Sequence, residues 1–108
     1  MASLTELHQL GQSTWLNYLR NSFIRSGELA GRVGLGVQGV TANAQVYERA
    51  IAGSSDYDAA ISRAVSEGKP ARLIHQSLMV DDIQRAADVL HPVFEESNRY
   101  DGFVSFEV

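Results

Sequence analysis

Four polar residues lie where predicted strands of this chain end, and they are the first candidates for chemistry. Asn17 ends the first predicted strand, Thr41 and Asn43 follow the second, and Glu107 ends the third. In a barrel of parallel strands, side chains at the carboxyl ends of the strands converge on one face, where they can bind a polar ligand or exchange protons. The alternative is that they cap strands or bind neighbouring loop backbone, and their spacing leaves both interpretations open.

A glycine-rich segment, residues 34–39, matches the spacing of a dinucleotide-binding loop. That loop must follow a strand and open a helix, so that the pyrophosphate meets the helix N-terminus. Here the glycines follow a predicted helix and lead into a predicted strand. We therefore interpret the segment as a helix-to-strand connection and not as a nucleotide site.

Other kinds of catalytic or metal site are not indicated. The three histidines, at positions 8, 75 and 91, are far apart and show no metal-ligand spacing, so we expect them on the surface or packed against helices. The chain has no cysteine, which excludes disulfides and Cys-ligated zinc. We predict neither a metal nor a cofactor.

Composition narrows the class of protein. The 108 residues are 44% hydrophobic and carry a net charge of −4, with the basic residues scattered among acidic ones. Without a basic face or run, nucleic acid and anionic membranes are poor partners. No stretch approaches a membrane span and no targeting segment is evident, so a cytoplasmic protein is expected. The length suits one domain but not a closed eight-stranded barrel.

Periodicity and turn residues predict the order of elements. A short helix opens at Ser3 and ends at Gly11, and another starting near residue 26 is broken by later glycines. Trp15, in the first predicted strand, is expected in the hydrophobic core of the protein. Strands separated by helices indicate βαβ units and a parallel sheet. The predicted strands cover residues 14–16, 37–41 and 103–106, and four further helices cover 44–52, 55–67, 69–78 and 81–96.

Three segments together resemble the N-terminal third of a transaldolase. They are Ser13-Thr14-Trp15-Leu16-Asn17-Tyr18, Gly39-Val40-Thr41-Ala42-Asn43-Ala44-Gln45 and the terminal residues 101–108. The resemblance implies an α/β fold, a partial (β/α) barrel of TIM type with about three parallel strands and several covering helices, as a single domain over residues 1–108. It also implies a relationship to enzymes of the pentose phosphate pathway. These enzymes move dihydroxyacetone between sugar phosphates through a Schiff base on a strand lysine.

The resemblance has gaps at the residues that carry the chemistry. The family's acid/base Asp falls on Asn17, whose amide cannot exchange protons near neutral pH. Thr41 and the substrate-contacting Asn43 are kept, and Glu107 matches the family's third-strand Glu. The Schiff-base lysine and the phosphate-binding arginines lie on later strands. The only lysine here, Lys69, opens a helix beside a glycine turn and is a poor substitute.

These departures lead to one main expectation and two alternatives. We expect a transaldolase-like protein that is inactive alone and acts by associating with itself, as a homo-oligomer, or with a complementary chain. It could instead be the N-terminal part of a longer or split transaldolase. The third possibility is a small module that binds a sugar phosphate through the four strand-end residues.

Overall fold

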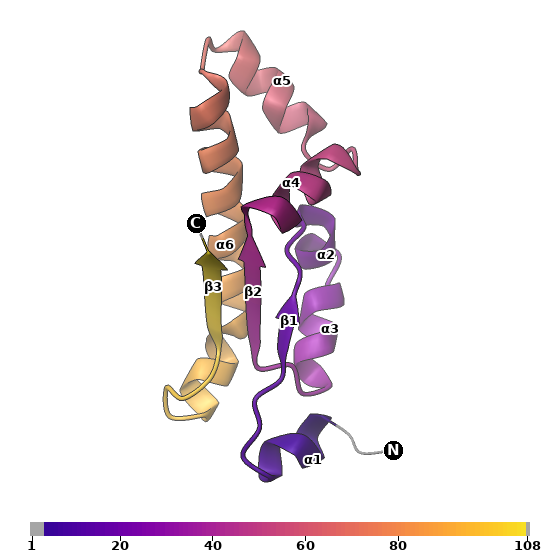
Figure 1. Cartoon of the computed structure of the whole chain (residues 1–108), viewed down its shortest axis with the longest axis vertical. Coiled ribbons are helices and arrows are strands. Elements are labelled where there is room, and N and C mark those ends of the chain that lie inside the picture. The colour runs from indigo at the N-terminus through magenta and orange to yellow at the C-terminus, as the bar shows by residue number, and fades with distance from the viewer. Residues whose placement is uncertain (1–3, 108) are drawn as a thin grey trace.

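The computed structural model describes residues 4–107, which form a three-stranded parallel sheet with helices behind it (Figure 1). The strands β1 (Trp15–Asn17), β2 (Gly39–Asn43) and β3 (Phe103–Glu107) lie side by side in that order. The predicted α/β class, with three parallel strands and several helices, is confirmed, and the open sheet is consistent with part of a TIM-type barrel. The helices are α1 (Leu4–Gln9), α2 (Asn21–Arg25), α3 (Glu28–Gly34), α4 (Ala44–Ala52), α5 (Asp58–Ser66) and α6 (Ala71–Glu96).

One face of the sheet packs against helices. Leu16, Val40 and Val104 are in register across the three strands, and Val40 is fully buried. Behind them, α6 contacts β3 and also packs against α2 and α3 (Figure 1). Side chains alternate between the faces of a strand, so this row and the next position, where Ala42 pairs with Phe106, form the sheet's contribution to the core.

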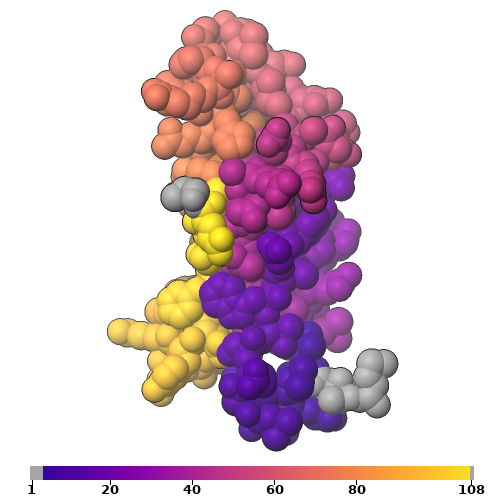
Figure 2. Space-filling model, in the orientation of Figure 1, coloured from indigo at the N-terminus to yellow at the C-terminus, as the bar shows by residue number. Residues whose placement is uncertain are grey.

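The opposite face is exposed, and we call it the open face. In Figure 1 the described helices lie behind the sheet or beyond its ends, and Figure 2 shows atoms of the strands at the surface in the middle of this view. In a finished parallel sheet both faces are normally covered. The open face consists of Trp15, Asn17, Gly39, Thr41, Asn43, Phe103, Ser105 and Glu107.

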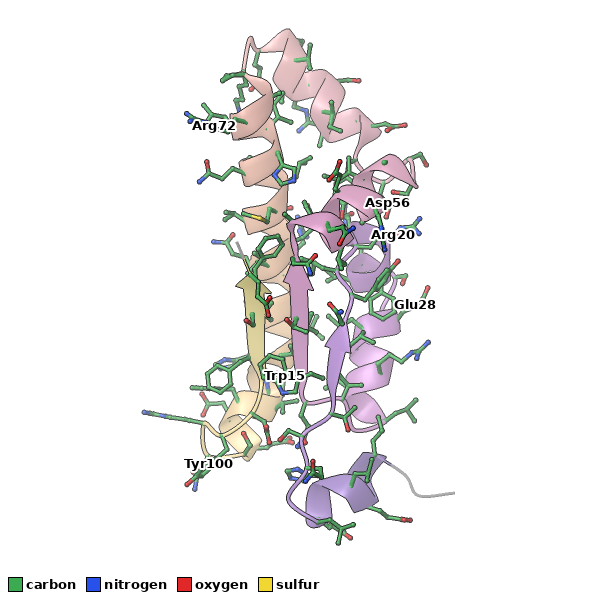
Figure 3. The ribbon with its side chains drawn as sticks, in the orientation of Figure 1. Trp15, Arg20, Glu28, Asp56, Arg72 and Tyr100 are labelled. Atoms are coloured by element: carbon green, nitrogen blue, oxygen red, sulfur yellow. The ribbon has the colours of Figure 1, made fainter. Side chains whose placement is uncertain are left out.

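Trp15 lies on this open face, so its predicted place in the core is wrong. The residue is 37% exposed, and Figure 3 shows its ring in front of the sheet. The indole covers the backbone of Gly39, where a Cβ atom would overlap the ring. The sequence pattern identified an apolar strand residue, but it did not reveal that this side of the strand has no covering layer.

The two helices predicted over residues 69–78 and 81–96 are one helix, α6, of 26 residues. Acidic residues are favourable in the first turn of a helix, so Asp81 and Asp82 favoured a new helix starting at residue 81. No glycine or proline separates the two segments, so the backbone hydrogen-bond ladder continues between them. Pro92 lies inside α6, which continues beyond it to Glu96.

Smaller differences concern the ends of elements. α2 was not predicted, β2 runs over residues 39–43 instead of 37–41, and α5 starts at Asp58 instead of residue 55. α5 starts late because Asp56 and Tyr57 turn toward α2 and bind its first backbone N–H groups. The predicted N-cap Ser3 lies outside the described residues.

A buried carboxylate, that of Asp82, connects four segments. The residue is 1% exposed, and it accepts hydrogen bonds from the hydroxyls of Tyr47 (2.8 Å) and Tyr57 (2.5 Å) and from Nδ2 of Asn21 (2.8 Å). The donors come from α4, from the turn before α5 and from α2. Burial, together with the neighbouring Asp82, raises the pKa of both tyrosines above their ordinary value, so both remain protonated donors.

Replacing Asp82 with alanine should lower the free energy of unfolding by at least about 3 kcal/mol, because two hydroxyls and one amide would lose a buried acceptor. Urea unfolding followed by circular dichroism measures the loss. Asp81 is a matched control, because it is adjacent, exposed and paired with Arg85 at 3.0 Å. Asp81→Ala should change stability by no more than about 0.5 kcal/mol. Equal losses in the two variants would contradict the assigned role.

Candidate functional site

The four predicted site residues lie on the open face, toward the carboxyl ends of the strands. Asn17 is opposite Thr41 in the register of β1 and β2, and Asn43 is opposite Glu107 in the register of β2 and β3. Neighbours in register on parallel strands point to the same side. The sheet therefore gathers an amide, a hydroxyl, a second amide and a carboxylate from distant parts of the chain. Their roles toward a substrate stay predictions.

Asn43 has a structural role as well. Its side-chain oxygen accepts a hydrogen bond from the backbone N–H of Val46 at 2.9 Å, which makes Asn43 the N-cap of α4. For Asn43, the alternative interpretation of strand-end polar residues as caps is therefore correct, because its side-chain oxygen serves as one. The cap also fixes the side chain at the edge of the open face, so the amide nitrogen has a defined position near the β2–β3 pair.

The loop that follows β1 is held by Asp56. Arg20 Nε donates to Asp56 Oδ2 at 2.9 Å, and the backbone N–H of Ser22 donates to the same oxygen at 2.9 Å. Figure 3 shows the Arg20 and Asp56 side chains close together near α4. The Arg20 guanidinium, followed by the Ser22 contact, holds the pKa of the Asp56 carboxyl well below its usual range. Asp56 therefore stays charged and orients Arg20.

Sequence reasoning missed Asp56, Tyr57 and Asp82 as organisers of this region. Their partners are 25 to 61 positions away in the chain. Helical periodicity describes only neighbours on the same helix, so it placed Tyr57 inside the predicted helix 55–67 and did not reveal these partners. The one available signal was the short polar turn at residues 53–56, whose length leaves side chains free to bind another element.

The glycine-rich segment and His75, considered above for nucleotide and metal binding, are structural parts of the fold. The glycine-rich segment connects the end of α3 at Gly34 to the start of β2 at Gly39, as predicted. His75 packs edge-on against Tyr47, with ring centroids 5.7 Å apart. Within residues 4–107, no group of side chains has the composition of a metal site, and no helix is long and apolar enough to cross a membrane.

Comparison with known proteins decides the family. A family model described as Transaldolase/Fructose-6-phosphate aldolase matches residues 15–108, which is most of the chain. The chain belongs to this family. The match covers all three strands, and with them the four strand-end residues.

Similar proteins are much longer than this chain. It is 47% identical over 106 residues to transaldolase 2 of Nostoc punctiforme, 42% identical over 106 residues to a transaldolase of Trichodesmium erythraeum, and 38% identical over 104 residues to one of Thiobacillus denitrificans. These alignments include 95–97% of this chain but only 28–29% of each relative. The chain therefore spans a little over a quarter of the length of these transaldolases.

The lowered pKa of Asp56 predicts how stability depends on pH. A carboxyl group whose pKa is lower in the folded state stabilises the fold above its unfolded pKa of about 3.9, and the stabilisation disappears as the pH falls through the folded pKa. The difference in the free energy of unfolding between the native chain and Asp56→Asn should be constant from pH 7 to 5 and shrink below about pH 4. Urea titrations at several pH values measure it. A difference that grows in acid would contradict the assignment.

Proposed function

We propose that this chain supplies the first three strands of a transaldolase-type barrel, is inactive alone, and acts by associating with another chain or a second copy of itself. The observation that carries the proposal is the uncovered face that holds Asn17, Thr41, Asn43 and Glu107. A closed barrel of this type needs eight strands, and the described residues contribute three. An occupant of the open face would complete the site that these residues begin.

The sheet's edges favour such an association. Among the described residues, the outer edges of β1 and β3 have no strand beside them, and such edges readily pair with another chain. Two aromatic residues, Trp15 and Phe103, flank Gly39 in one row of the open face and are 37% and 45% exposed. Covering them would remove apolar surface from water and stabilise the assembly. We propose that residues of the segments 13–19 or 102–108 lie at or near the interface.

Lys69 is poorly placed to replace the missing Schiff-base lysine. It lies in the turn between α5 and α6, where its ammonium is 3.2 Å from the Glu67 carboxylate and its side chain is half exposed. A nucleophilic lysine must be an amine near neutral pH, which needs desolvation or a neighbouring cation. Lys69 is half exposed and contacts a carboxylate, so it lacks the desolvated environment that such a lysine needs. This environment supports the proposal that the chain does not catalyse the reaction alone.

A second candidate is that the chain is the N-terminal part of a longer or split transaldolase. The coverage of the relatives favours it, since nearly the whole chain aligns with 28–29% of each transaldolase. In this case Asn17 would still replace the family's acid/base. The complete protein would then transfer dihydroxyacetone between sugar phosphates either slowly or by a modified mechanism. Under both proposals we place the protein in the cytoplasm, on the basis of its family.

The chemical part of the proposal predicts two results. The 108-residue chain should show no transaldolase turnover, and borohydride should trap no adduct with fructose 6-phosphate, because no suitably placed lysine is present. Joining residues 1–108 to the part of Nostoc punctiforme transaldolase 2 that follows its matched region supplies the later strands. In this chimera, Asn17→Asp should raise kcat by about 10²–10⁴-fold by restoring a general acid/base.

One control variant and a readout that locates the adduct make this experiment decisive. Lys69→Ala should change neither the trapping result nor the activity of the chimera. Mass spectrometry of borohydride-treated protein locates any adduct. The proposal would be contradicted by an adduct on Lys69 in the isolated chain. It would equally be contradicted if the chimera with the native Asn17 were as active as the chimera that carries Asn17→Asp.

Association is tested by light scattering after size-exclusion chromatography. The native chain should be a dimer or larger at concentrations on the order of tens of micromolar, because its edges and open face are otherwise exposed. Ser105→Glu adds a charge to the open face at the middle of the outer strand β3 and should shift the chain toward monomer. Arg63→Glu, on α5, should have no effect. A folded, monomeric native chain would overturn this prediction.

Phe106→Asp serves as a separate control for folding in the same measurement. Phe106 is on the helix face and packs edge-on against Tyr47, with ring centroids 6.3 Å apart. A charge there should disrupt the core, as judged by circular dichroism. Ser105→Glu should leave the circular dichroism spectrum unchanged, so a change in its oligomeric state reports on the open face alone.

A further inference from the structure

A hollow lies between the loop after β1 and the helix α4. Its volume is about 320 Å³, and its lining includes Asn17, Tyr18 and Arg20 on one side and Val46 and Arg49 of α4 on the other. Asn17 belongs both to the hollow and to the open face. A hollow of this size accommodates a small metabolite. The polar residues among those that line it are Asn17, Tyr18, Arg20 and Arg49.

Arg20 is held in place by its neighbours. Two of its nitrogens contact Asp56, at 2.9 and 3.4 Å, and hydrogen bonds to Asp56 and Tyr18 raise the pKa of the guanidinium. A guanidinium has five N–H donors, so those not directed at these partners remain available to a ligand. Because Asp56 fixes its orientation, Arg20 loses little conformational freedom when a ligand binds.

Arg49 supplies the charge that is not neutralised. It lies in the last turn of α4, its side chain is exposed, and within residues 4–107 it forms no ion pair. Asp56 offsets one of the two guanidiniums at the hollow, and no acidic residue is among the described residues that line it. The chain as a whole has a net charge of −4, so a hollow whose described lining has two arginines and no acidic residue differs from the average of the molecule.

We propose that this hollow binds a phosphate group, with Arg49 and Arg20 as its charged contacts and with Asn17 and Tyr18 as neutral donors. Guanidiniums form paired, charge-assisted hydrogen bonds with phosphate oxygens, which suits two arginines on opposite walls of a small hollow. The ligand is either free phosphate or the phosphate of a small sugar. In the second case the sugar would extend past Asn17 toward Thr41, its neighbour in register on the open face.

This site goes beyond the proposed barrel function because all its contacts belong to this chain. The resemblance to transaldolases implies phosphate-binding arginines on later strands, whereas Arg20 and Arg49 accompany the first two strands. Binding at the hollow therefore needs no partner and no completed barrel. A failure of the chimera to gain activity would leave the anion site standing, and an absence of anion binding would leave the barrel proposal standing.

The test is a titration of the isotopically labelled 108-residue chain followed by NMR. Inorganic phosphate and fructose 6-phosphate should both shift the side-chain amide signals of Asn17 and the Nε–H signal of Arg49, whereas fructose should not. Arg49→Gln should weaken phosphate binding about tenfold, which is the effect of losing one charged hydrogen bond. Arg49→Lys should retain part of the affinity, and added salt should weaken binding to the native chain.

Arg63→Gln, on α5, is the matched control and should bind as the native chain does. Tighter binding of fructose 6-phosphate than of phosphate would identify a sugar phosphate as the ligand, and equal binding would identify free phosphate. The proposal is overturned if Arg49→Gln binds phosphate as well as the native chain does, if the shifts map elsewhere, or if fructose binds equally well. Circular dichroism spectra confirm that each variant is folded.

Discussion

The carboxylate of Asp82 is buried where α2, α4, α6 and the turn before α5 meet beside the hydrophobic core. A buried charge is tolerated only when donors surround it, and here three neutral donors from α2, α4 and the turn before α5 do so. The same turn provides Asp56 and Tyr57, which bind the first N–H groups of α2. α2 has only five residues and would not be stable alone. Its position, and that of the loop carrying Arg20, therefore depends on these polar contacts.

The second constraint is that a parallel sheet needs a covering layer on both faces. This chain covers one face with α2, α3 and α6 and leaves the other with Trp15, Phe103 and the four strand-end residues (Figures 1 and 3). The arrangement suits the interior of a barrel, where alternate residues of each strand point inward. Membership of the transaldolase family and the short coverage of its relatives agree with this geometry. The proposed association follows from the uncovered open face. The proposed anion site follows from the hollow between the loop after β1 and α4, which shares Asn17 with that face.

Much of the fold was predictable because it depends on local patterns. The bounds of α4 were predicted at residues 44–52 and those of β3 to within one residue, since capping residues and turns mark both. The predicted division of α6 was wrong because both Asp81 and Asp82 were interpreted as the start of a helix. The sequence does not distinguish these two aspartates. One of them, Asp81, pairs with Arg85 at the surface, whereas Asp82 faces the core. Periodicity could not separate their roles, because the partners of Asp82 lie on other elements.

The sequence by itself determined the order of the three strands, most of the helices between them, the family resemblance, and the four strand-end residues as candidates, because each depends on neighbouring residue types or on a short motif. Tertiary structure decided which faces are covered, where Trp15 lies, and which side chains meet. Asn17 and Glu107 approach one edge of the sheet only through the β1–β2–β3 register. Arg20 and Arg49 line one hollow only because Asp56 and the cap at Asn43 place the loop and α4 beside each other. Contacts between distant segments depend on packing and on buried hydrogen bonds, and no local pattern encodes these.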